Sequence, residues 1–88
     1  MRIDRLLWFL RFVKTRGSAQ ELVASGHIRL NGARVLRSAR AVSVGDRLVF
    51  PMGEAVRSVE IIAMPSRRGP AGEAATCYRT LDAPDLPS

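Results

Sequence analysis

The sequence predicts an α+β domain in which two N-terminal helices pack on a small, curled, mostly antiparallel sheet. Apolar residues recur with helical spacing before Gly26, and after it they alternate with polar residues, as in a half-buried strand. Short strand-like runs then follow at intervals of about 8–12 residues, separated by turn-forming pairs. A chain of 88 residues that is 47% hydrophobic can form one globular domain with a modest core.

The first helix is predicted over residues 3–13. One stripe of this helix is apolar and should face the core: Ile3, Leu6, Leu7, Leu10 and Val13. The opposite face carries Arg5, Trp8, Arg11 and Phe12. Guanidinium groups beside flat rings suit RNA, where they can hold phosphates and stack on bases. The alternative is that Trp8 and Phe12 pack beneath a later segment of the same chain.

The second helix is predicted over residues 18–25. Ser18 and Glu21 have the spacing of a capping box, and Gly26 is expected to form a left-handed cap at the helix end. Lys14 and Arg16 lie just before the helix, where unpaired N–H groups attract anions. We therefore expect a phosphate contact here, with Arg16 outside the core. A solvated basic turn is the alternative.

A hairpin is predicted next, with its turn at Asn31-Gly32 and its returning strand at Val35 and Leu36. The face away from the core should carry His27, Arg29 and Arg34, although His27 could be an ordinary exposed residue. A basic loop over residues 37–41 adds Arg37 and Arg40.

Two further strands are predicted over residues 48–50 and 57–64. Gly45-Asp46 and Gly53-Glu54 form the turns, Pro51 ends the first strand, and Val59, Ile61 and Ala63 should point inward. The predicted core of the whole domain is Leu6, Leu10, Leu22, Ile28, Leu30, Leu48 and Ile61.

The C-terminal part should be mostly extended. Residues 65–72 are rich in proline and glycine, residues 73–78 can form a short helix, and residues 82–88 form a proline-rich tail that is expected to fray. We therefore predict a binding domain over residues 1–64 and an extended C-terminal segment over residues 65–88.

Charge is distributed unevenly along the chain. The net charge is +6, and cations are concentrated in the first 40 residues, whereas the remainder is close to neutral. Such a one-sided field favours a polyanion, with nucleic acid ahead of an anionic membrane surface. The apolar run from Leu6 ends at Arg11, so neither a signal peptide nor a membrane span is expected. An amphipathic helix lying on lipid would leave the basic hairpin unexplained.

Catalysis and metal binding are not expected. The single cysteine, Cys77, cannot form an internal disulfide, which fits a reducing cytosol. His27 is the only histidine and has no acidic or cysteine neighbour at ligand spacing. Asp4 is expected in the first turn of the first helix, where the helix dipole stabilises its negative charge, and Glu21 is expected to belong to the capping box. Neither carboxylate is then left for a nucleophile–base pair. We predict a cytoplasmic protein that is not an enzyme and has no cofactor.

The order of motifs resembles a known family. The run R-I-D-R-x-L-W-x-x-R-F-x-K-T-R, then G-H-I-R-L-N-G, a basic loop and V-x-x-G-D, is similar to the RNA-binding domain of ribosomal small-subunit protein four. This resemblance covers roughly residues 2–50. The W-x-x-R-F-x-K-T-R block and the later R-R-G-P-A-x-E-A-x-x-x-Y run resemble the ribosome-associated heat-shock protein fifteen group.

The resemblance implies ribosomal RNA and the large ribosomal subunit as partners, with a role in stress. Members of the group are described as binding a dissociated large subunit that still carries a nascent chain on tRNA, so peptidyl-tRNA is a further expected partner. The family contacts RNA through the first two helices and the hairpin. We expect a monomer, and the candidate RNA-binding residues are Arg2, Arg5, Trp8, Arg11, Lys14, Thr15, Arg16, Gln20, His27, Arg29, Asn31, Arg34, Arg37 and Arg40.

This sequence departs from the family pattern at two places. Where the family often has Lys-Pro-Ser after the hairpin, the chain has Arg37-Ser38-Ala39, which keeps a charge but loses a stiffening proline. Some relatives also carry a long basic C-terminal extension, whereas this sequence stops at Ser88. A general binder of structured or single-stranded RNA, a duplex-DNA binder and a basic protein–protein adaptor are the alternatives.

Overall fold

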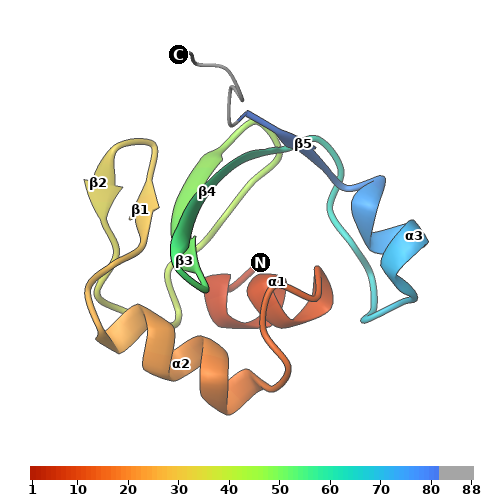
Figure 1. Ribbon diagram of the computed structural model, residues 1–88. Coiled ribbons are helices and arrows are strands. Elements are labelled where there is room, and N and C mark those ends of the chain that lie inside the picture. Colours follow the sequence, from red (N-terminus) through yellow and green to blue (C-terminus); the bar gives the residue numbers. More distant parts are fainter. Residues whose placement is uncertain (82–88) are drawn as a thin grey trace.

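The computed structural model describes residues 1–81, and the tail predicted to fray over residues 82–88 lies outside them. The elements follow the order α1 (Ile3–Phe9), α2 (Arg16–Ala24), β1 (Arg29–Leu30), β2 (Ala33–Arg34), β3 (Arg47–Met52), β4 (Ala55–Ile61), α3 (Ala71–Ala75) and β5 (Tyr78–Thr80). The strands form one five-stranded antiparallel sheet in the order β2-β1-β3-β4-β5. Figure 1 shows this sheet curling over α1, with the β1–β2 hairpin at one end and α3 at the other. The predicted α+β fold is confirmed.

The core lies between α1, α2 and the concave side of the sheet. It contains Ile3, Leu6, Leu7, Leu10, Ala19, Val23, Ile28, Leu30, Val35, Val42, Leu48, Phe50, Val59 and Ile61. All of the predicted core residues are buried except Leu22, which is partly buried and packs against the cluster. The apolar stripe of α1 supplies much of this core, because the helical period places its members on one face.

Helix α1 is shorter than predicted. It ends at Phe9 rather than residue 13, and Arg11 adopts a left-handed conformation with φ of 64°. The Phe12 N–H donates to the Leu7 carbonyl (3.0 Å) and the Arg11 N–H to the Trp8 carbonyl (3.1 Å). These two bonds define a Schellman motif, in which the left-handed position is usually glycine. An arginine there gave no sign in the sequence that the helix would stop.

Helix α2 begins at Arg16, and the predicted capping box is wrong. Thr15 is the N-cap, and its side-chain oxygen accepts the Ser18 N–H at 2.9 Å, while Glu21 is exposed. Threonine and serine are both good caps, so the helix can begin at the earlier of the two residues and bury Ala19. At its other end the helix stops as predicted, with Gly26 at φ of 79°.

The hairpin turn is also as predicted, but the returning strand comes earlier. Asn31 and Gly32 both have positive φ, as a two-residue type I′ turn requires. Such a turn pairs Leu30 directly with Ala33, so β2 is Ala33–Arg34 rather than Val35 and Leu36. Val35 is buried and its N–H donates to Ile28 (2.9 Å), whereas Leu36 is exposed.

The remaining strands differ in their ends. Pro51 does not stop β3, because β1 pairs only with Val49 and Leu48, so that at Pro51 the strand has a partner on one side only. Strand β4 ends at Ile61, and Ala63 is exposed rather than inward. Strand β5, which was not predicted, adds Tyr78–Thr80 to the far edge of the sheet, next to β4.

Candidate nucleic-acid interface

Asp4 is a buried carboxylate that gathers donors from both N-terminal helices. Its side chain has no solvent exposure. Oδ1 accepts from Arg2 Nε (3.0 Å) and from the Arg5 backbone N–H (2.7 Å). Oδ2 accepts from Arg2 Nη2 (3.0 Å), Arg16 Nη2 (3.3 Å) and Gln20 Nε2 (3.2 Å). We call Arg2, Asp4, Arg16 and Gln20 the Asp4 cluster.

The Asp4 cluster holds its carboxylate in the charged form. Burial by itself raises the pKa of Asp4, but the hydrogen bonds from Gln20, Arg2, the Arg5 N–H and Arg16 outweigh it and leave that pKa below its ordinary value. Arg16 therefore binds a buried acid, and its own Nε is buried with no hydrogen-bond partner among residues 1–81. The Arg16 side chain is nevertheless 36% exposed, so it lies outside the core as expected, and its contact with phosphate stays a prediction.

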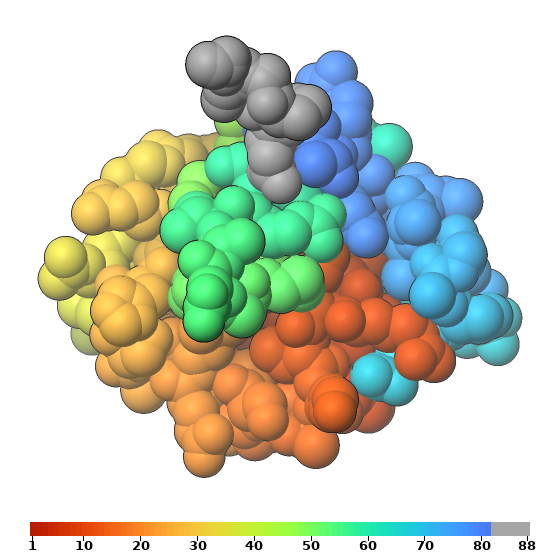
Figure 2. Space-filling model, viewed as in Figure 1, coloured from red at the N-terminus to blue at the C-terminus, as the bar shows by residue number. Residues whose placement is uncertain are grey.

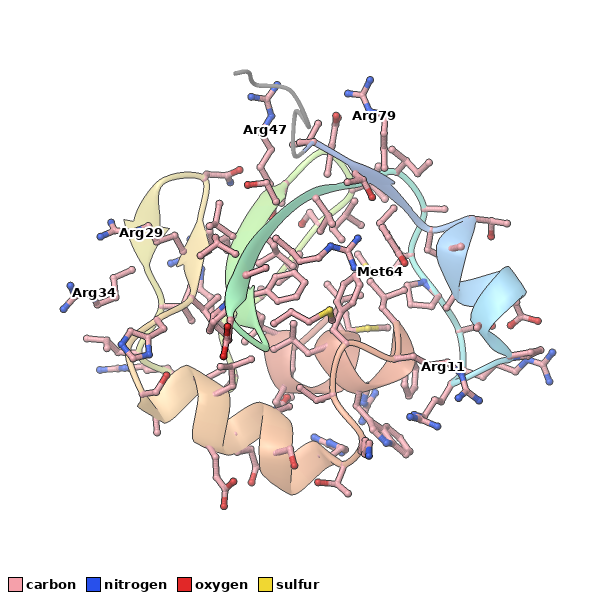
Figure 3. All side chains as sticks on the ribbon, in the orientation of Figure 1. Arg11, Arg29, Arg34, Arg47, Met64 and Arg79 are labelled. Atoms are coloured by element: carbon pink, nitrogen blue, oxygen red, sulfur yellow. The ribbon has the colours of Figure 1, made fainter. Side chains whose placement is uncertain are left out.

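Four arginines of the hairpin and the loop after it lie outside the Asp4 cluster. We call them the hairpin–loop surface: Arg29, Arg34, Arg37 and Arg40. Arg29 and Arg34 pair directly across the hairpin, and Figure 3 shows both side chains reaching outward from it. Within residues 1–81, the side chains of Arg34, Arg37 and Arg40 have no hydrogen bond or ion pair; Arg29 has only a long one, 3.4 Å to the Gly32 carbonyl. Like charges that lie opposite each other on paired strands repel, so a phosphate bound between these guanidinium groups would reduce their repulsion.

A hollow accompanies this surface. It has a volume of about 360 Å³ and is lined by Arg34, Val35, Leu36, Arg37, Ala39 and Arg40. Leu36 is 66% exposed, so the hollow offers apolar surface beside the guanidinium groups. This combination can receive a nucleotide, whose base is apolar on its faces and whose phosphate is charged.

Several other predicted site residues have structural contacts. Asn31 donates to Asp46 Oδ1 (3.1 Å) and accepts the Arg47 N–H (2.9 Å), so it ties the hairpin to the turn before β3. Thr15 caps α2. Arg5, Lys14 and His27 are exposed.

The two aromatic residues of the predicted basic face have different surroundings. Phe12 packs against Phe50 and Tyr78, with ring centroids 4.7 and 4.8 Å away, so the structural alternative is correct for Phe12. Trp8 is only partly buried, and the Arg68 guanidinium lies 5.5 Å from its ring centroid. Sequence reasoning missed Arg68 as a neighbour of α1, because 60 residues separate it from Trp8 along the chain.

Residues 1–81 contain no group of three or more histidine, cysteine or acidic side chains arranged to hold a metal ion. In the same part of the chain, no helix is both long and apolar enough to cross a membrane.

Comparison with known proteins identifies the family. The S4 domain model matches residues 1–48. Heat shock protein 15 of Escherichia coli K12 is 36% identical over 78 residues, which are 89% of this chain and 58% of that protein. Small ribosomal subunit protein uS4 of Fusobacterium nucleatum is 36% identical over 63 residues, 72% of this chain and 31% of that protein.

Solved structures agree with the sequence comparison. A trimeric structure of Vibrio cholerae heat shock protein 15 superposes with a TM-score of 0.88 at 30% identity, covering 93% of this chain and 82% of that one. This chain spans 58% of the length of its E. coli relative. By these matches the chain belongs to the S4-domain family and, within it, to the heat shock protein 15 group.

Proposed function

We propose that this chain is a non-catalytic, cytoplasmic RNA-binding protein of the ribosome, which contacts ribosomal RNA through its hairpin–loop surface. The observation that carries the proposal is the set of arginines around the hollow of about 360 Å³ whose side chains have no hydrogen bond or ion pair to the described residues 1–81. Arginine forms forked hydrogen bonds to phosphate, and the exposed Leu36 adds apolar surface for a base. Kinship with heat shock protein 15 and with ribosomal protein uS4 supports a ribosomal partner.

The finer proposal is that the partner is a free large ribosomal subunit carrying a nascent chain on tRNA, and that binding helps return this subunit to use. It rests on the heat shock protein 15 resemblance, including the block over residues 67–78. We proposed a monomer from the sequence, whereas the V. cholerae relative is described as trimeric. Measuring the mass of the free protein by light scattering therefore belongs with any binding study.

Binding to purified particles tests the proposal. Large subunits, small subunits and duplex DNA should be compared as competitors for the labelled protein at about 150 mM salt. Large subunits are expected to compete best. Equal competition by duplex DNA would favour a general polyanion binder, and no competition by any nucleic acid would favour a protein–protein adaptor.

Salt dependence measures how many phosphates are held. If about five cations contact phosphate together, log affinity should fall with log salt at a slope of about −4. A slope near zero would rule out phosphate contacts as the basis of binding.

A further inference from the structure

We propose a second RNA-phosphate site at the C-terminal end of α1, formed by Arg11 and Arg68 beside Trp8; we call these three residues the helix-end site. The proposal rests on the RNA-binding function proposed above and assigns a role to the segment after β4. Trp8 and Arg11 were among the residues expected to contact RNA, whereas Arg68 was not.

Two reciprocal hydrogen bonds dock the segment onto α1. Arg11 Nε donates to the Gly69 carbonyl (2.6 Å), and Arg68 Nε donates to the Trp8 carbonyl (3.0 Å). Figure 2 shows the cyan atoms of this segment set against the red and orange atoms of the N-terminal helices. Each arginine is thus fixed through Nε, and its terminal nitrogens have no hydrogen-bond partner within residues 1–81. Fixed guanidinium groups lose little conformational entropy when they bind phosphate.

Charge around the site favours an anion. Glu73, the acid nearest in sequence, is held by Arg67 through two hydrogen bonds of 3.0 and 2.6 Å. The Arg67–Glu73 pair is therefore neutral overall, and the charge of the adjacent Arg68 is not cancelled. The Trp8 ring lies under the Arg68 guanidinium, which orients that group by a cation–π contact.

The backbone at Arg11 points to a role for its side chain. Arg11 has φ of 64° at a helix end where glycine would fit without strain, and Gly26 fills the equivalent place after α2 with φ of 79°. A non-glycine residue in this conformation costs free energy. The arginine side chain supplies what glycine cannot, namely the bond to the Gly69 carbonyl and a fixed cation.

The helix-end site is separate from the hairpin–loop surface. Figure 3 shows Arg11 beside the segment that leads into α3, on the opposite side of the molecule from Arg29 and Arg34. The protein measures 34 × 28 × 23 Å. One phosphate cannot reach both sites, so an RNA that occupies both must extend across the molecule.

The single tryptophan makes the site testable, because Trp8 is the only one in the chain and its emission reports on this site alone. The full chain is titrated with a fluorescein-labelled RNA hairpin, and both the anisotropy of the RNA and the Trp8 emission are recorded. Binding should change the Trp8 emission. Arg68→Gln should weaken binding by roughly tenfold and flatten the salt slope by about one.

Two further variants separate binding from folding. Arg11→Gly relieves the backbone and loses one hydrogen bond, so its Tm should stay close to wild type while its affinity falls by roughly tenfold. The double variant Arg67→Gln/Glu73→Gln alters the same segment at constant net charge and should keep the wild-type affinity within about twofold.

Two results would overturn the helix-end site, and a third would overturn the proposed function. RNA binding by anisotropy with an unchanged Trp8 emission, and with wild-type affinity in Arg68→Gln and Arg11→Gly, would overturn the helix-end site but leave the hairpin–loop surface in place. An equal loss in the Arg67→Gln/Glu73→Gln control would also overturn it, because loosening of the segment would then explain the effect. An absence of RNA binding in the wild type would overturn the proposed function itself.

Discussion

The Asp4 cluster and the hairpin–loop surface both contain arginines, but these arginines differ in how available they are to a ligand. In the Asp4 cluster, Arg2 and Arg16 share one buried carboxylate, so much of their charge is offset. In the hairpin–loop surface, the four arginines are exposed, and none of them forms an ion pair within residues 1–81. The number of cations in a segment is therefore a poor guide to its binding surface. Their position relative to a buried acid decides which of them remain available.

The largest expected effect comes from removing the acid. Asp4→Ala leaves the donors of Arg2, Arg16 and Gln20 without their acceptor. The free energy of unfolding should fall by about 3 kcal/mol, at the low end of the cost of breaking a buried pair, because both arginines still reach solvent. Urea denaturation measures this change. Glu54→Ala, in the exposed turn before β4, is the control and should change stability by less than about 0.5 kcal/mol.

The same carboxylate predicts how stability depends on pH. The pKa of Asp4 is lowered in the folded protein, so the stability it contributes is present above its unfolded pKa and is lost as pH falls through the folded pKa. The difference in Tm between wild type and Asp4→Asn should therefore be constant between about pH 5 and 7 and should narrow below about pH 4. A difference that persists unchanged into strong acid would show that the contacts of Asp4 do not require its charge.

Substitutions in the hairpin–loop surface should lower RNA affinity and leave the stability of the fold almost unchanged. The double variant Arg34→Gln/Arg37→Gln removes two cations that have no ion pair in the described part of the chain. Affinity for large-subunit RNA should therefore fall by about tenfold or more, and the salt slope should flatten by about two. Its Tm should match wild type or rise slightly, since repulsion with Arg29 is relieved. Fluorescence anisotropy and a thermal melt measure the two quantities. A large loss of Tm would mean that these arginines have structural partners.

Arg16 differs from its neighbour Lys14, which is exposed and unpaired within residues 1–81. Arg16→Ala should lower the free energy of unfolding by about 1–1.5 kcal/mol through its lost bond to Asp4. Lys14→Ala should leave stability within about 0.5 kcal/mol but should flatten the salt slope of RNA binding. If both variants changed only the affinity, Arg16 would belong with the available cations after all.

The smallest effect is expected at Arg47. Its side chain is exposed, and Figure 3 shows it at the top of the sheet, away from Arg29 and Arg34. Arg47→Gln should weaken RNA binding by less than about threefold, as a screened surface charge does. A loss equal to that of Arg34→Gln, in the same anisotropy titration, would mean that binding follows total charge.

The features that could be predicted from the sequence are those that depend on residues close together in the chain. The turn at Asn31-Gly32 and the cap at Gly26 are local, and each appears where it was expected. The Asp4 cluster could not be predicted, because Arg16 and Gln20 reach Asp4 only through the packing of α2 on α1. The end of α1 was missed because Arg11 occupies a position that normally carries glycine. Arg68 was missed because its partner lies at the other end of the chain.

Strand β5 has a consequence for how the chain can be divided. It covers the outer edge of β4, pairing with Val59, Glu60 and Ile61, and Arg79 forms an ion pair with Glu60. A protein cut at the boundary proposed after residue 64 would lose this strand and leave unpaired those backbone N–H and C=O groups of β4 that face β5, while the pairing of β4 with β3 would remain. Open edges recruit strands from other molecules. Removing β5 replaces a three-residue edge strand by the seven-residue strand β4, so we expect the shortened protein to aggregate more readily even though the buried leucines of α1 are retained.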